Sequence, residues 1–327
     1  MVFSRIGVAG AGAWGLALAI VAARAGREVR LWGRPSAAFA ALVASRHSPR
    51  LPGVALPDEI ALVGGLGGLE GVDALLLVAP AQATRATVAA LASALRARPP
   101  LVLCAKGFET ASGLLLSEAA AQAAPDFPLA ALSGPSFAAD VAASLPTAVT
   151  LAASDAALAA GLAEALQGAN FRIYDSDDLS GVEIGGAAKN VLAIACGAAA
   201  GMGLGASASA ALVARGFAEL TRFGETYGAR PATLMGLSGL GDLVLTCASP
   251  QSRNFAYGFD LGRGLKAVEA GGGRLAEGVF SAPALVRLAR QRHVEMPIAA
   301  AVAALVAGRI TAREAVDLLL SRPRTHE

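Results

Sequence analysis

Residues 5–15 read RIGVAGAGAWG and give the clearest indication of the fold. Residues 6–9 form an apolar run of strand length, and the spacing GxGxxG follows at residues 10–15. Residues 16–25 show a helical pattern that ends before Gly26, a residue type favoured after helix C-termini. A lone GxGxxG is a weak pattern, but a strand before it and a helix after it make it specific.

Each glycine of this turn has its own physical reason. Gly10 permits a tight turn, Gly12 lets the backbone approach a pyrophosphate, and Gly15 lets the helix pack against the strand. The helix N-terminus, next to Ala13, presents free N–H groups and a partial positive charge to phosphates. We therefore predict that this turn binds NADP or NAD; a glycine-rich turn without a ligand is the alternative.

The first half of the chain alternates strand-like and helix-like runs. The predicted strands are residues 6–9, 29–32, 74–78, 101–104, 129–132 and 148–151, and the predicted helices are residues 16–25, 37–44, 84–95, 114–123 and 156–166. Such alternation predicts a parallel sheet that is covered by helices on both faces. The predicted fold class is therefore α/β, with a doubly wound sheet of the Rossmann type.

The pattern changes after a last strand-like run at residues 171–174. Beyond an acidic loop, nearly every apolar run has helical length, and Thr311 with Glu314 offers a capping box. We predict two domains: residues 1–180 bind NAD(P), and residues 181–327 form an all-α domain for substrate binding and catalysis.

The composition excludes several kinds of partner. The 327 residues carry 27 basic and 25 acidic side chains, a net charge of +2, which does not indicate a nucleic-acid partner. The cysteines, Cys104, Cys196 and Cys247, show no CxxC spacing, which favours buried thiols in a reducing compartment. His47, His293 and His326 are scattered, so we expect surface or packing roles and no metal site.

Neither the first residues of the chain nor its longest uncharged apolar stretch favours insertion into a membrane. Residues 1–6 lack the pattern of a signal peptide. Residues 191–214 are uncharged and long enough to span a bilayer, but their glycines and serines favour a helix, a turn and a second helix. We expect a cytoplasmic protein without a membrane span.

Arg34 bears on the choice of nucleotide. NAD-specific sites usually carry Asp or Glu about 20 residues after the glycines, and Arg34 stands in that region here. A guanidinium there pairs with a 2′-phosphate and stacks on adenine, which favours NADP or use of both nucleotides. A solvated surface arginine is the alternative.

Ligands in open α/β sheets lie beyond the carboxyl ends of the strands. At these ends the sequence places Pro80, Lys106 and the run 133–136, which contains Gly134 and Ser136. Lys106 follows a buried strand and precedes a glycine, so we expect it to reach a phosphate or a carbonyl oxygen. An ordinary strand-end lysine in solvent is the alternative.

The second half has few charges in apolar settings, so each is informative. Lys189 and Asn190 lie within an apolar helix, where burial readily lowers the pKa of a lysine and suits it to general acid catalysis. Asp242 lies among apolar residues, and the polar run 249–254 could bind an anion. The alternatives are a lysine that reaches solvent, an N-capping aspartate and a surface loop.

With these residues the sequence closely resembles the bacterial NAD(P)-dependent sn-glycerol-3-phosphate dehydrogenase family, from Gly7 to about Leu320. The motifs that carry the resemblance are GAGAWG (10–15), LWGR (31–34), AKGFE (105–109), SGPSFA (133–138), GGAAKNVLAI (185–194), GLGDLVLTC (239–247), QSRN (251–254) and VEMPI (294–298). Together they are far more specific than any one of them.

The resemblance implies reversible reduction of dihydroxyacetone phosphate to glycerol 3-phosphate, a precursor for phospholipid synthesis. By similarity, Lys189 is the general acid and base, with Lys106 and Asp242 also at the catalytic site. The implied substrate-binding residues are Lys106, Gly134, Ser136, Lys189, Asn190, Asp242, Thr246, Ser252, Arg253 and Asn254. The implied cofactor contacts beyond the glycine turn are Trp14, Arg34, Pro80, Lys106, Ala138, Arg253 and Glu277.

Two departures from the family pattern stand out. The family often has Asn-Ala-Arg where this chain has Ser207-Ala208-Ser209, so a charged contact is missing. Phe108 replaces a usual leucine, and we expect this exchange to matter little.

Two other functions fit the same sequence pattern. A related NADP-dependent reductase of the 3-hydroxyacid dehydrogenase or ketopantoate reductase type would need a carboxylate site where we expect a phosphate site. A sensor that binds NAD(P) without turnover would lack the polar residues of the second half. The oligomeric state, a homodimer among the options, stays open, as do the preferred nucleotide, the physiological direction of the reaction and feedback regulation.

Overall fold

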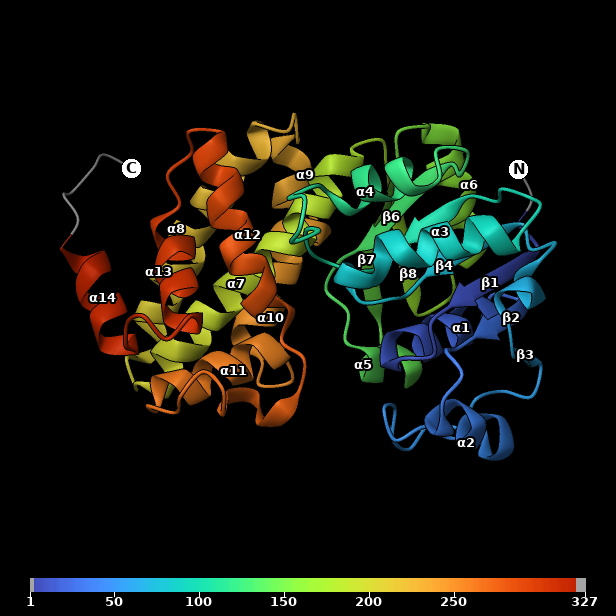
Figure 1. Ribbon diagram of the computed structural model, residues 1–327, viewed down its shortest axis with the longest axis horizontal. Coiled ribbons are helices and arrows are strands. Elements are labelled where there is room, and N and C mark those ends of the chain that lie inside the picture. Colours follow the sequence, from blue (N-terminus) through green and yellow to red (C-terminus); the bar gives the residue numbers. More distant parts are fainter. Residues whose placement is uncertain (1–2, 322–327) are drawn as a thin grey trace. The chain divides into compact units, whose positions relative to one another are not determined.

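The computed structural model describes residues 3–321 (Figure 1). Residues 1 and 2, which belong to the stretch without a signal-peptide pattern, and His326 lie outside the described part. The chain divides into two compact units. The sheet unit comprises Met1–Ala105 and Leu114–Val182, and the helical unit comprises Lys106–Gly113 and Glu183–Glu327. The segment Lys106–Gly113 therefore belongs to the helical unit although it lies within the first half of the sequence.

The sheet unit contains one eight-stranded sheet with the strand order β3-β2-β1-β4-β5-β6-β7-β8. The strands are β1 (Arg5–Ala9), β2 (Glu28–Trp32), β3 (Ile60–Val63), β4 (Ala74–Leu77), β5 (Leu101–Leu103), β6 (Leu129–Ser133), β7 (Thr147–Ala153) and β8 (Phe171–Ser176). The order changes direction between β1 and β4, which is the arrangement of a doubly wound fold. The predicted fold class is confirmed.

The sheet departs from the prediction at one edge and at two short elements. β7 pairs with β6 antiparallel, with Leu132 opposite Leu151, whereas every other pairing of the described strands is parallel. The strand β3 and the helix α5 (Ala138–Ala142) were not predicted. Both are short, so neither contains enough residues for a periodic pattern to stand out.

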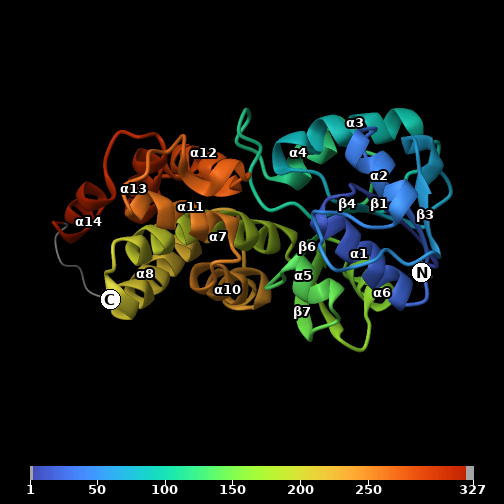
Figure 2. The same cartoon turned by 90° about the horizontal axis from the view of Figure 1, so that it is seen from below.

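Helices cover both faces of the sheet, as Figure 2 shows for α3 and α4 on one side and α1 and α6 on the other. The remaining helices of this unit have bounds close to those expected from sequence. They are α1 (Ala13–Arg24), α2 (Ala37–Ser45), α3 (Thr84–Ala94), α4 (Leu116–Ala123) and α6 (Ala156–Leu166).

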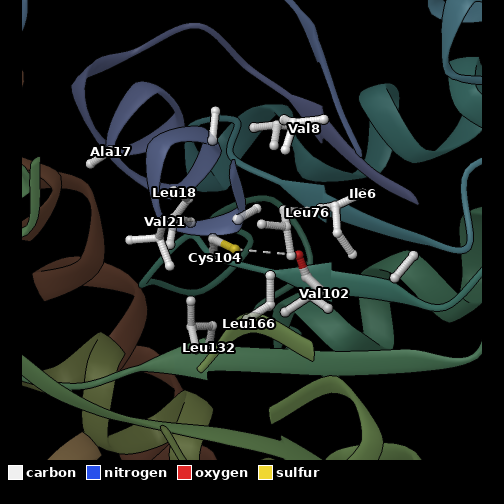
Figure 3. Close-up of a cluster of buried hydrophobic side chains, with 14 of the residues drawn as sticks. Ile6, Val8, Ala17, Leu18, Val21, Leu76, Val102, Cys104, Leu132 and Leu166 are labelled. Carbon is white, nitrogen blue, oxygen red and sulfur yellow. Dashed lines mark hydrogen bonds between the residues drawn. The ribbon is translucent and has the colours of Figure 1, made fainter. Parts of the chain in front are cut away.

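Two apolar clusters fill the spaces between the sheet and its helices, because successive strand residues point to opposite faces. On β4, Leu76 packs into the cluster beneath α1 and α6, and Leu75 and Leu77 pack into the cluster beneath α3 and α4. Figure 3 shows the first cluster, where Leu76 lies beside Leu18 of α1. The sheet thus forms a rigid platform whose parallel strands end at one common edge.

The helical unit is built around α7 (Leu179–Gly201), whose most apolar window is 89% buried. The other helices are α8 (Gly205–Glu225), α9 (Pro231–Met235), α10 (Asp242–Ala248), α11 (Arg253–Gly262), α12 (Glu277–Gln291), α13 (Pro297–Val306) and α14 (Ala312–Leu320). The predicted helix, turn and helix over residues 191–214 are confirmed by α7 and α8. The capping box of Thr311 and Glu314 is also present at the start of α14.

Two helical stretches are long and apolar enough to pass a length-and-composition test for a membrane span: α7 and residues 231–248. Burial identifies α7 as a core helix. The second stretch is a composite of α9, a π-helical turn and α10, and it contains the charged Asp242. Both are weak evidence for a membrane span.

The cysteines and two of the histidines have the burial that the sequence predicts. Cys104, Cys196 and Cys247 are buried and form no disulfide with one another. His47 and His293 are exposed.

Candidate active site

The glycine turn of the sheet unit has the geometry that its spacing predicts. Gly10 has φ +136°, and a Cβ there would lie 2.2 Å from the carbonyl oxygen of Val78. A Cβ on Gly15 would lie 1.8 Å from the carbonyl oxygen of Gly10, so α1 packs directly against the turn. Gly12 faces open space and no side chain caps α1. The uncapped N–H groups and the open backbone fit a nucleotide pyrophosphate.

The other predicted residues of the sheet unit follow the carboxyl ends of neighbouring strands. Arg34, beyond β2, and Pro80, beyond β4, are exposed. Beyond β6, the Ser136 hydroxyl donates to the carbonyl oxygen of Gly134 at 3.1 Å, and Ala138 begins α5. Trp14, at the start of α1, is half-buried against the core. Because β1, β2, β4, β5 and β6 are parallel, these positions share one edge of the sheet.

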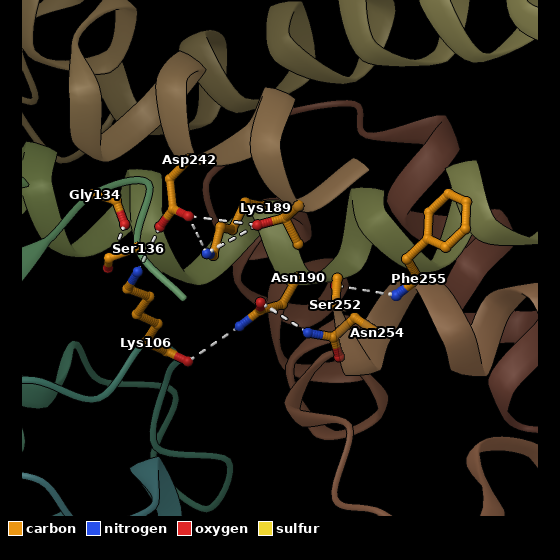
Figure 4. Close-up of polar contacts among 10 residues, drawn as sticks. Lys106, Gly134, Ser136, Lys189, Asn190, Asp242, Ser252, Asn254 and Phe255 are labelled. Carbon is orange, nitrogen blue, oxygen red and sulfur yellow. Dashed lines mark hydrogen bonds and ion pairs between the residues drawn. The ribbon is translucent and has the colours of Figure 1, made fainter. Parts of the chain in front are cut away.

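The chemical centre of the helical unit is Asp242, whose carboxylate lies between two lysines (Figure 4). The Lys106 Nζ atom donates to Asp242 Oδ2 at 2.6 Å, and the Lys189 Nζ atom donates to Asp242 Oδ1. The side chain of Asp242 is 1% exposed, compared with 9% for Lys189 and 16% for Lys106. One carboxylate is therefore shared by two amino groups in a largely buried site.

Burial lowers the pKa of the Lys189 ammonium from 10.5 to about 7. The neighbouring carboxylate of Asp242 opposes this shift, and the like charge of Lys106 adds to it. A lysine with a pKa near neutrality can both give up and accept a proton at the operating pH. Lys189 thus has the property expected of a general acid and base.

Thr246, one helical turn after Asp242, completes the surroundings of Lys189. Its hydroxyl accepts from Lys189 Nζ at 3.1 Å and lies 3.4 Å from Asp242 Oδ1, to which it donates. The ammonium is thus held by two oxygen atoms of α10, with its third proton left for another acceptor.

Close backbone packing between α7 and the turn before α10 fixes the position of Lys189 relative to Asp242. A Cβ on Gly185 of α7 would lie 2.7 Å from the carbonyl oxygen of Ser238. Ser238 belongs to the π-helical turn Leu237–Gly241, which leads directly into α10. Lys189 follows Gly185 by one helical turn on the same face of α7, so the absence of a side chain at 185 brings the lysine and the aspartate together.

A chain of side-chain amides connects Lys106 with α12. Asn190 Nδ2 donates to the carbonyl oxygen of Lys106 at 3.4 Å, and its Oδ1 accepts from Asn254 Nδ2 at 2.9 Å. Asn254 Oδ1 in turn accepts from the backbone N–H of Gly278 at 2.9 Å. The amide group of Asn254 is therefore engaged within the protein. Glu277, which precedes Gly278, begins α12 and is half-buried.

The polar run 249–254 forms the start of α11. The Ser252 hydroxyl accepts from the backbone N–H of Phe255 at 3.2 Å and so caps the helix. Arg253 is the first helical residue and is exposed. The first N–H groups of a helix have no partner within the helix, so this terminus and the guanidinium together offer donors to an anion.

Phe108 is a further residue of this unit whose packing partner no local sequence pattern indicated. Phe108 is 0% exposed, and its ring meets the ring of Phe223 edge to face at 6.0 Å. The sequence offers one signal for such a role, an aromatic residue two positions after Lys106. It cannot indicate the packing partner, because Phe223 on α8 is distant in sequence.

A groove of about 1050 Å³ also lies in the helical unit, between α7, α8, α13 and α14. Alanine, leucine and valine side chains make up most of its walls, and none of the predicted site residues lines it. The chemistry is therefore assigned to the polar centre around Asp242.

A nucleotide-binding glycine turn in one unit and a buried lysine with a pKa near 7 in the other define the class: a two-domain NAD(P)-dependent dehydrogenase. Two family models match the chain, those of the N-terminus and the C-terminus of NAD-dependent glycerol-3-phosphate dehydrogenase, over residues 5–159 and 178–317. The chain belongs to this family.

Individual relatives agree with the family models. The chain is 57% identical to a glycerol-3-phosphate dehydrogenase of the NAD(P)+ type from Methylobacterium radiotolerans, over 97% of this chain and 96% of the relative. A second such enzyme, from Azorhizobium caulinodans, is 56% identical over 99% of both chains. The crystal structure of glycerol-3-phosphate dehydrogenase from Coxiella burnetii has a TM-score of 0.93 and 38% identity, and the match covers 98% of this chain and 99% of that one.

Proposed function

We propose that this protein catalyses reversible hydride transfer between NAD(P)H and dihydroxyacetone phosphate, with sn-glycerol 3-phosphate as the reduced product. The observation that carries the proposal is the buried pair of Lys189 and Asp242, in a chain that belongs to the glycerol-3-phosphate dehydrogenase family. The proposal assigns nucleotide binding to the first domain, residues 1–180, and substrate binding and catalysis to the second, residues 181–327. It adds Lys106 to the catalytic groups, because this lysine lies in the same polar centre.

Lys189 carries the proton in this proposal. NAD(P)H supplies the hydride when it is bound. As negative charge develops on the carbonyl oxygen, the Lys189 ammonium stabilises it and then donates a proton. In the reverse direction the neutral amine accepts the hydroxyl proton of glycerol 3-phosphate. Asp242 and Thr246 hold Nζ so that its remaining proton is available to the substrate.

The substrate phosphate is assigned to the start of α11. The guanidinium of Arg253 and the backbone N–H groups of the first turn supply the donors. Because the Asn254 amide is bonded to Asn190 and Gly278, its contribution is made through the backbone. Gly134, Ser136 and Lys106 complete the proposed substrate contacts. Binding energy from the phosphate then orients the carbonyl group for reaction.

The nucleotide is assigned to the glycine turn, with Trp14, Pro80, Ala138, Lys106, Arg253 and Glu277 as further contacts. Arg34 is exposed at the end of β2, where a guanidinium can pair with a 2′-phosphate. We therefore propose that the protein uses NADP or both nucleotides.

A spectrophotometric assay tests the proposed reaction. Purified protein is mixed with NADPH or NADH and with dihydroxyacetone phosphate, ketopantoate or a 3-oxoacid, and absorbance at the nicotinamide band is followed. The proposal expects turnover with dihydroxyacetone phosphate at a kcat/KM far above that for the carboxylate substrates. Preferential turnover of a carboxylate substrate would contradict the phosphate assignment.

Three finer points belong to the same proposal. Supply of glycerol 3-phosphate for phospholipid synthesis follows from the product. A cytoplasmic location is supported by three buried cysteines that form no disulfide, which suits a reducing compartment. A homodimer is the assembly to test, by light scattering on the purified protein.

A further inference from the structure

The segment Lys106–Gly113 carries one of the two lysines on Asp242, yet it forms neither a helix nor a strand, and its buried residues are Gly107, Phe108 and Gly113. Phe108 is its largest buried side chain, with 0% exposure.

The ring of Phe108 lies in an aromatic row on the helical unit. It meets Phe223 of α8 edge to face at 6.0 Å, and Phe223 meets Tyr227 at 5.1 Å. The guanidinium of Arg292, at the end of α12, lies 3.5 Å from the centre of the Tyr227 ring. The row thus joins the segment to two helices of the unit through well-defined ring contacts.

Polar and packing contacts hold the far end of the segment. Arg287 Nη2 of α12 donates to the carbonyl oxygen of Thr110 at 2.6 Å, and Gly113 packs closely on Leu288. At the near end, Asn190 Nδ2 donates to the Lys106 carbonyl oxygen at 3.4 Å. Of these contacts, Phe108 supplies the greatest buried apolar area, and it lies two residues from Lys106.

We propose that Phe108 is a positioning residue: its ring, packed on Phe223, holds the Lys106 ammonium against Asp242 and so sets the charge balance around Lys189. This inference rests on the proposed function, because it concerns the lysine that carries the proton. It also accounts for the expected tolerance of leucine at this position, since a leucine side chain can fill the same apolar space.

The position of Lys106 can be followed through its effect on the pKa of Lys189. The charged groups that act on Lys189 are Asp242, from α10, and Lys106, from the segment; the Cys247 thiol of α10 is a further titratable neighbour. Lys106 lowers the pKa of Lys189 and Asp242 raises it. If Lys106 moves away, the pKa of Lys189 rises, because the positive charge that disfavours its protonated form is lost while the carboxylate of Asp242 stays.

The test is the pH dependence of kcat for oxidation of glycerol 3-phosphate by the full-length Phe108→Ala variant. In this direction Lys189 must be neutral, so kcat rises with pH through the pKa of Lys189. We expect the rising limb to move to higher pH and kcat at pH 7 to fall about tenfold or more, as for a misplaced catalytic group. Phe223→Ala removes the partner ring and should move the limb in the same direction if Phe108→Ala does not fold.

Two controls separate positioning from a general loss of packing. Phe108→Leu should keep the limb at its original pH. Phe127→Ala removes a buried ring from the sheet unit, so it should lower stability and leave the limb in place. The proposal is overturned if Phe108→Ala and Phe223→Ala both fold and the rise of kcat with pH stays at its original pH. It is also overturned if Phe127→Ala shifts this rise by an equal amount.

A parallel measurement on Lys189→Met keeps this inference apart from the proposed function. Full turnover in Lys189→Met would reject the acid–base assignment itself. Loss of turnover in Lys189→Met together with an unmoved limb in Phe108→Ala would reject only the anchoring role of Phe108.

Discussion

The glycine turn of the sheet unit and the lysine centre of the helical unit are built in opposite ways. The turn uses backbone atoms within six consecutive residues, and its conformation follows from the absence of side chains at Gly10 and Gly15. The lysine centre uses side chains, and its three charged members, Lys106, Lys189 and Asp242, are far apart in sequence. The first site binds by shape and helix polarity, whereas the second depends on burial to change the chemistry of an amino group.

This difference predicts different responses to substitution. A change in the turn should act through sterics, and its effect should depend on whether a Cβ has room. A change in the lysine centre should act through charge, and its effect should depend on pH.

Lys189→Met should have the largest effect. Loss of a positioned proton-transfer group is expected to lower kcat by about 10²–10⁴. NADPH binding, measured by fluorescence titration, should survive because the glycine turn is unchanged. A kcat close to that of the parent protein would remove Lys189 from the mechanism.

Asp242→Asn should have the next largest effect. The substitution keeps the shape but leaves two lysines in a buried site without their carboxylate, which should destabilise the fold by about 3–5 kcal/mol in urea unfolding. Because Asp242 raises the pKa of Lys189, that pKa should fall, and the rising limb of kcat for glycerol 3-phosphate oxidation should move to lower pH. A limb that moves to higher pH would contradict the charge assignment.

A matched pair of alanine substitutions tests the turn. Gly15→Ala places a Cβ against the carbonyl oxygen of Gly10 and should destabilise the protein by about 1–3 kcal/mol. Gly12→Ala faces open space, so its stability should change by less than about 1 kcal/mol, while NADPH affinity falls because the new methyl group stands where the pyrophosphate approaches. Thermal unfolding and nucleotide titration of both variants measure the two effects. Equal destabilisation by the two variants would contradict the steric account.

Arg34→Glu should have the smallest effect, confined to nucleotide choice. Loss of a charge-assisted contact with the 2′-phosphate should lower the preference for NADPH over NADH by about tenfold. The ratio of kcat/KM values for the two nucleotides measures it. If the ratio is unchanged, Arg34 has no part in nucleotide selection.

The same contrast explains what the sequence could predict. The turn, most strands and the helices on both faces follow from local spacing and periodicity, so their positions were predicted to within a few residues. The antiparallel edge at β7 was missed because strand direction depends on the route of the chain around the sheet, and the apolar run of β7 looks the same in either direction.

The candidate site could be predicted in part. Lys189 and Asp242 stood out as charges in apolar surroundings, and the structure brings them together. The roles of Gly185 and Phe108 depend on partners at Ser238 and Phe223, which no local pattern links to them. The engaged amide of Asn254 was likewise hidden, because its bonds with Asn190 and Gly278 exist only once three helices have packed.

The central claim is that burial gives Lys189 a pKa near neutrality and makes it the proton carrier. The most direct test is the pH dependence of kcat for glycerol 3-phosphate oxidation by the unmodified protein. The account predicts a rising limb with an apparent pKa of about 7. A limb near 10.5, the ordinary value for lysine, or a kcat independent of pH across this range, would contradict it.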